Sequence, residues 1–227
     1  MNEADVLTCW EQGRDLPMLQ RALWYLQSHD SQQSWESLLQ LPIGERDRRL
    51  FSLRCQLFGS PLHVFTACPQ CQLELEFSFD SEQLFDNKSA SQSASFKLAG
   101  SQVRLLNTAD QLTISHLPKD EVQQFIMKNC VQTEQGQDKP ELDGVIEAML
   151  QHDPLAEILL QLQCDQCRHQ WPLLLDVVSF FQQELDDYVK SLLQQVHILA
   201  SAYGWSEQDV LSLSAERRHV YMEMVTS

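Results

Sequence analysis

Two short cysteine pairs are the residues of this chain whose type and spacing are suited to chemistry. Cys68 and Cys71 enclose Pro-Gln, and Cys164 and Cys167 enclose Asp-Gln, so each pair has the spacing Cys-x-x-Cys. Two intervening residues allow both thiolates of a pair to reach one ion, and two pairs complete the tetrahedral four-sulfur shell that Zn²⁺ prefers. Because a closed shell leaves no position for water or substrate, the sequence predicts a structural zinc site.

Two other interpretations of the cysteines remain open. The four residues could be buried free thiols, or a Cys-Pro-x-Cys pair could be a redox dithiol of the thioredoxin type. A redox role explains one pair and leaves the other unused, whereas a zinc ion uses both. His63 and His169 are near the pairs in sequence and would replace a thiolate only if one cysteine were not a ligand.

The segments beside each pair alternate as β-strands do. Apolar residues dominate four short segments, 62–66, 73–79, 158–162 and 171–175. Such runs, with a period of two around the first pair, predict two β-hairpins at 61–80 and 156–176, which would be the two halves of a zinc ribbon. Many such turns have glycine after the second cysteine, where φ is positive, but Gln72 and Arg168 occupy that position here.

The rest of the chain predicts a mostly helical α+β protein. In the N-terminal helical region, residues 1–60, apolar residues have helical spacing in three segments, 19–26, 35–41 and 44–58. The charged residues of the third helix, from Glu45 to Arg54, are expected to form a solvated face with i, i+4 pairs.

The C-terminal helical region, residues 177–227, has the most regular pattern. The apolar residues of 181–203 are spaced by three or four positions, as on one face of a long amphipathic helix. Gly204 is suited to end that helix in a left-handed conformation, and Ser206 and Ser214 are suited to begin two shorter helices.

Residues 81–155 are predicted to be an insertion between the two halves of the ribbon. In chain order we expect a mobile polar loop, a hairpin, a helix, an exposed loop and a second helix, at 86–95, 96–106, 122–127, 132–140 and 142–150.

Composition limits the classes of partner. The net charge is −16, and such an excess of acids opposes binding to nucleic acids and to anionic membranes. The chain has no apolar run of eighteen residues, and its N-terminus lacks the basic start and apolar run of a signal peptide. Seven cysteines, an odd number, fit a reducing compartment. We therefore expect a cytoplasmic protein.

The sequence gives no positive sign of an enzyme. It contains no glycine-rich phosphate loop, no nucleophile elbow and no His-Glu-x-x-His helix. Its seven histidines are scattered, without an i, i+4 pair that would bind a metal. We expect a non-enzymatic protein.

Three stretches outside the cysteine pairs carry a family resemblance. They are Tyr203-Gly204-Trp205-Ser206-Glu207, Arg217-Arg218 followed by Tyr221, and Gly44-Glu45-Arg46-Asp47 with Arg49 and Leu50. With the cysteine pairs and Asp153-Pro154, these stretches resemble the T4-type baseplate hub assembly chaperones of contractile-tailed phages and extracellular contractile injection systems. The resemblance covers about half of the chain and leaves out the first forty residues and the insertion.

The resemblance implies an assembly chaperone that helps the hub and spike of a baseplate to assemble. Its partner would be the hub or spike protein. Tyr203, Trp205, Arg217 and Arg218 are candidate partner-binding residues, although the aromatic residues could instead pack the C-terminal helices on each other. Two alternatives are a structural baseplate subunit that stays in the particle and a zinc-ribbon adaptor unrelated to baseplates.

Overall fold

The computed structural model describes residues 2–80, 93–136 and 138–226 and shows an α+β protein that is mostly helical, as the sequence predicts. The helices are α1 (Glu3–Gly13), α2 (Met18–His29), α3 (Trp35–Leu39), α4 (Ile43–Phe58), α6 (Thr108–Ile114), α7 (Lys119–Asn129), α8 (Leu142–His152), α9 (Val177–Tyr203), α10 (Glu207–Leu211) and α11 (Ala215–Thr226). The strands are β1 (Pro61–Ala67), β2 (Glu74–Asp80), β3 (Ser95–Leu98), β4 (Ser101–Arg104), β5 (Val131–Thr133), β6 (Leu159–Gln163) and β7 (Gln170–Leu174). Most of the predicted mobile loop at 86–95 lies outside the described residues.

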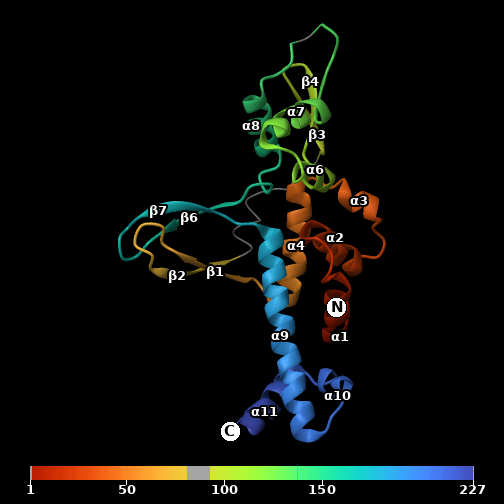
Figure 1. Cartoon of the computed structure of the whole chain (residues 1–227), viewed down its shortest axis with the longest axis vertical. Helices are drawn as coiled ribbons and strands as arrows, with labels where there is room; N and C mark the ends of the chain where they lie inside the picture. Colours follow the sequence, from red (N-terminus) through yellow and green to blue (C-terminus); the bar gives the residue numbers. More distant parts are fainter. Residues whose placement is uncertain (1, 81–92, 137, 227) are drawn as a thin grey trace.

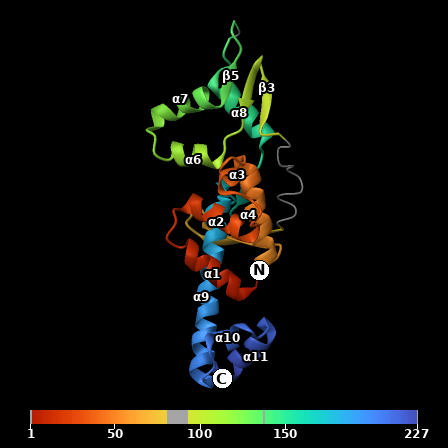
Figure 2. The ribbon, with the colours of Figure 1, turned by 90° about the vertical axis from the view of Figure 1, so that its right-hand side faces the viewer.

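Helix α9 is the element on which the other parts are assembled (Figure 1). Helices α1, α2 and α4 pack against its N-terminal half, and α10 and α11 fold back on its C-terminal end (Figures 1 and 2). Asp176 begins α9 by accepting a hydrogen bond from the Ser179 N–H at 3.2 Å, and Gly204 ends it in the left-handed region with φ of 69°. The sequence predicted this helix and its glycine end correctly.

The described apolar residues form separate clusters in three places. The main core lies between α1, α2, α4, α9 and the inner faces of β1 and β6, and includes Leu23, Leu50, Leu62, Leu160 and Phe181. The insertion lobe, residues 93–152, has its own core of residues such as Val103, Ile126 and Val145. The C-terminal lobe, residues 196–226, is built on Val196, Leu199 and Val210. Helix α9 therefore joins the main core to the C-terminal lobe through unbroken helix.

The insertion lobe differs from the sequence prediction in two elements. The predicted hairpin is present as β3 and β4, but β5 pairs with β4 and extends it to a three-stranded sheet. The prediction of an exposed loop at 132–140 was wrong for its first residues, because a three-residue strand has no periodicity that a sequence can show. Helix α6 was also missed, although Asn107 and Asp110 form the capping box that begins it.

The charged face of α4 is the largest correction. The expected pairs are present, since Arg48 and Arg49 both bond to Glu45 at 2.8 Å and 2.6 Å. Arg46 and Arg54, however, are each only 2% exposed. Helix α4 lies between α2 and α9 and below the insertion lobe, so it is enclosed on more sides than an amphipathic surface helix (Figures 1 and 2).

The buried charges of α4 are paired, as burial requires. Arg46 bonds to Asp47 at 2.6 Å and reaches α6 of the insertion lobe through Thr108 and Gln111. Burial raises the pKa of Asp47 to about 6, although Arg46 acts in the opposite direction. These contacts attach the insertion lobe to the N-terminal end of α4.

Gly44 stands at this junction, and we expect a methyl group there to be costly. The Gly44 N–H donates to Asp153 Oδ2 at 2.9 Å, and an added Cβ would lie 2.0 Å from Asp153 Oδ1 and 2.9 Å from Leu155 Cβ. Gly44→Ala should lower the free energy of unfolding by about 2 kcal/mol or more. Gly144→Ala, on the open surface of α8, should instead raise it by about 0.5 kcal/mol. Denaturant unfolding of both variants measures this contrast, and equal effects would contradict it.

No helix of the described chain has the length and apolar character needed to cross a membrane.

Candidate metal centre

The two cysteine turns have the same backbone structure. In the first, the Cys68 N–H donates to the Leu73 carbonyl and the Gln72 N–H donates to the Cys68 carbonyl, both at 2.9 Å. In the second, Cys164 and Arg168 make the two equivalent bonds at the same distance. Each turn joins two antiparallel strands, β1 to β2 and β6 to β7. The two predicted hairpins are therefore present, with a cysteine pair at the tip of each.

Residues other than glycine adopt left-handed conformations in both turns. Gln72 has φ of 61° and Arg168 has φ of 62° at the position after the second cysteine. A left-handed conformation costs a residue with a Cβ about 1 kcal/mol relative to glycine. Both turns thus have the left-handed geometry for which glycine is usual, although Gln72 and Arg168 occupy that position here.

The four thiols come together between the hairpin tips. The sulfur atoms of Cys68, Cys71, Cys164 and Cys167 all lie within 4.8 Å of one another. The Sγ atoms of Cys68 and Cys167 are 3.6 Å apart, as are those of Cys71 and Cys164. Zinc–sulfur bonds of about 2.3 Å in a tetrahedron place the sulfurs about 3.8 Å apart. This four-cysteine cluster is therefore the right size for one tetrahedral metal ion.

Hydrogen bonding and burial act in opposite directions on the thiols of the cluster, because backbone N–H groups favour a thiolate and burial opposes it. Cys68 and Cys164 are fully buried, whereas Cys167 is exposed. The N–H groups of Cys167 and Gln166 bond to the Cys164 sulfur and lower the pKa of that thiol to about 7. The His169 N–H lowers the pKa of Cys167, but desolvation and the three neighbouring thiols raise it by more, to about 12. Four thiolates at this separation need a cation to neutralise them.

The main core and a buried arginine hold the first hairpin in place. Leu62 and Val64 of β1 point into the main core. Arg54 of α4 makes two 2.7 Å bonds to the Glu184 carboxylate of α9, and it also donates to the carbonyls of Gly59 and Pro61, where β1 begins. One buried guanidinium thus connects α4, α9 and the start of β1.

The second hairpin is held by the same core. Leu160 and Leu162 of β6 are buried in it, and the Leu175 N–H bonds to the Ile158 carbonyl at 2.8 Å beyond the end of the ladder. Trp171 packs edge-on against Phe77 of the first hairpin, with ring centroids 6.3 Å apart. The hairpins therefore meet along their inner faces, and their tips project from the body (Figure 1).

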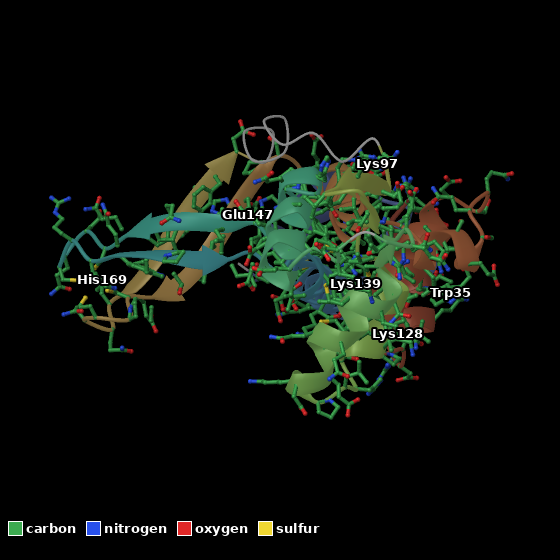
Figure 3. The ribbon with its side chains drawn as sticks, turned by 90° about the horizontal axis from the view of Figure 1, so that it is seen from above. Trp35, Lys97, Lys128, Lys139, Glu147 and His169 are labelled. Atoms are coloured by element: carbon green, nitrogen blue, oxygen red, sulfur yellow. The ribbon has the colours of Figure 1, made fainter. Side chains whose placement is uncertain are left out.

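The two histidines near the cysteines stay outside the cluster. His63 Nδ1 lies 3.0 Å from Glu76 Oε1, and the His169 ring stacks on Trp171 at 5.9 Å between centroids. Figure 3 shows His169 at the projecting end of the hairpins. Among the residues that the structure describes, the four cysteines alone form a group close enough to hold a metal.

The predicted partner-binding aromatics lie together in the C-terminal lobe. Tyr203 stacks on Trp205 with ring centroids 4.7 Å apart, and Tyr221 of α11 meets Trp205 edge-on at 5.0 Å. These rings pack the turn after α9 against α11, which is the packing role that the sequence left open. Tyr203 is still 40% exposed. Contact with a partner stays a prediction.

The two predicted arginines lie in different environments. Arg217 is exposed, whereas Arg218 is only 3% exposed. Arg218 makes two 2.6 Å bonds to the Glu3 carboxylate of α1 and one 2.7 Å bond to Gln195 of α9. The Arg218 guanidinium thus connects α11 to α1 and α9, and contact of either arginine with a partner stays a prediction. Neither Glu3 nor Gln195 was identified from the sequence, because neither has a local pattern that points to residue 218.

The fold and the cluster define an α+β protein with a four-cysteine candidate metal centre split across the chain. Comparison with family models, with curated proteins and with solved structures found no match to this chain.

Proposed function

We propose that the four-cysteine cluster binds one structural Zn²⁺. The proposal rests on the donor set, because four sulfur atoms at tetrahedral spacing favour zinc or iron, and a closed shell of four protein ligands leaves no site for substrate. Bound there, the ion would supply charge neutralisation and a crosslink between residues 68–71 and 164–167. Metal analysis of the purified protein should find about one zinc per chain. Zinc-free protein with two dithiols that cycle with thioredoxin would favour the redox alternative.

We further propose that this chain is a non-enzymatic, cytoplasmic assembly chaperone for the hub or spike protein of a contractile tail or injection system. The resemblance around Tyr203 to Glu207 and at Arg217-Arg218 carries this proposal. The structure is compatible with it, because the resembling stretches lie in the C-terminal lobe and at the junction around Gly44, both outside the insertion. Separate lobes on one frame of packed helices suit a protein that holds a partner before assembly.

The test of the chaperone role uses cells that lack the gene. A chaperone must bind its partner more tightly before assembly than after it, since only a difference in affinity releases the partner. The deletion should leave sheath and tube proteins present while the hub protein remains unassembled or insoluble. Mass spectrometry of purified particles should find little of this chain. A fixed ratio of the chain to the hub would instead make it a structural subunit.

A further inference from the structure

Strand β1 has one edge that no described strand covers. The β1–β2 sheet has two strands. The hydrogen bond from the Cys68 N–H to the Leu73 carbonyl fixes which residue pairs of the two strands exchange backbone hydrogen bonds and which pairs do not. In an antiparallel ladder these pairs alternate with non-bonded ones, whose backbone groups point outward. His63, Phe65 and Ala67 are in the non-bonded pairs, so their N–H and C=O groups point away from β2. Pro61, two residues before His63, follows the same alternation, because its carbonyl points outward and accepts a hydrogen bond from Arg54.

Within the part of the chain that the structure describes, the outward groups of β1 have no backbone partner. The described residues make no backbone hydrogen bond to His63, Phe65 or Ala67. Natural sheets usually protect such edges with proline or with charged side chains. Strand β7 has this protection, because Pro172 lies in a non-bonded pair of its ladder, with its nitrogen at the outer edge. After Pro61, strand β1 contains neither a proline nor an acidic or basic (Lys or Arg) side chain.

The side chains beside this edge specify the chemistry of the partner. Phe65 is 73% exposed, and it lies next to Glu76 and diagonally from Glu74 on the outer face of the hairpin. Residues 61–80 contain three acids and neither lysine nor arginine. A strand added beside β1 would lie about 10 Å from β2, a distance that lysine and arginine side chains span.

We propose that the free edge of β1 is a docking site for an extended segment of a partner protein, which adds to the sheet as a third strand. The segment pairs with the backbone of residues 63–67, covers Phe65 with an apolar side chain, and places lysine or arginine side chains over Glu74 and Glu76. A second copy of this chain is a poor occupant, because two molecules with net charge −16 would bring two acidic hairpins together. The inference relies on the proposed function only for the identity of the partner, a hub or spike protein.

The most direct test removes one outward backbone N–H group of β1 and leaves the hairpin folded. His63→Pro deletes an outward N–H that the ladder does not use, so the fold should survive. Binding of the purified hub or spike protein should weaken at least about tenfold. The matched controls are His63→Ala, which keeps the N–H, and Gln161→Pro, which makes the same change at the outer edge of β6. Both controls should bind like the natural chain.

Two further variants test the side chains. Phe65→Ala should weaken binding about tenfold, and the double variant Glu74→Lys, Glu76→Lys should do the same and remove the dependence of binding on salt. Zinc content and the unfolding midpoint should stay unchanged in every variant, since these side chains are exposed. Hub binding that is unaffected by all of them would overturn this inference and leave the chaperone proposal standing.

A crosslinking experiment covers the case in which the hub does not bind. A photoreactive benzoylphenylalanine replaces Phe65, or Gln161 as the control, in cells that express the whole gene cluster. A crosslink from position 65 to another protein, through a basic extended segment and lost in His63→Pro, would support the docking site while removing the proposed partner. Capture no stronger than at position 161, or capture of a second copy of this chain, would overturn the inference.

Discussion

Cys164→Ser should destabilise the whole main core and not only its own hairpin. A serine hydroxyl does not replace a thiolate in the four-cysteine cluster, and metal-binding energy in such a site is folding energy. Cys164 is fully buried, and the strands on both sides of the cluster contribute Leu62 and Leu160 to the main core. We expect the free energy of unfolding to fall by more than about 4 kcal/mol, and the melting temperature by about 10 °C.

The matched control is Cys55→Ser, which changes a half-buried thiol of α4 outside the cluster. It should cost about 1 kcal/mol or less. A zinc chelator should lower the melting temperature of the natural chain and of Cys55→Ser, but not that of Cys164→Ser. Calorimetry with and without chelator measures all three. An unchanged melting temperature for Cys164→Ser would show that the metal does not stabilise the fold.

Arg218→Ala should open the C-terminal lobe. The substitution removes both bonds to the Glu3 carboxylate and the bond to Gln195, and it leaves a partly buried acid without its cation. Breaking one partner of such a pair costs about 3 kcal/mol. Hydrogen exchange should therefore become faster in α10 and α11, while the amides of the main core remain protected.

Arg217→Ala is the control for this effect, because the neighbouring side chain is exposed. It should change stability by less than about 0.5 kcal/mol. The two variants, Arg217→Ala and Arg218→Ala, also distinguish two possible causes of weaker hub binding. If Arg217→Ala weakens hub binding without faster exchange, Arg217 contacts the partner; if Arg218→Ala alone does so, the lobe has lost its position. Unchanged exchange in Arg218→Ala would contradict the role of the buried ion pair.

Several features of the fold and the cluster follow from the sequence alone, because their causes are local. The Cys-x-x-Cys spacing and the alternation around it predict two hairpins with thiols at their tips. The three- and four-residue spacing of apolar positions predicts α9, and Gly204 and Ser206 predict where one helix ends and the next begins. Each of these signals lies within one element or its flanking turn.

Other features depend on contacts between residues far apart in the chain, which local patterns do not show. The acids that pair with Arg54 and Arg218 are 130 and 215 positions away, so local patterns predict a solvated Arg54 and a partner-binding Arg218, whereas the fold buries both side chains. β5 is too short to show a period and exists because β4 offers it an edge. The free edge of β1 is also a tertiary result, since periodicity predicts a strand but not which of its sides a neighbour will cover. The sequence by itself thus determined most of the elements and the four cysteines that cluster, while the tertiary structure decided which charges are buried and which strand edges no described strand covers, because burial and pairing depend on the whole packed chain.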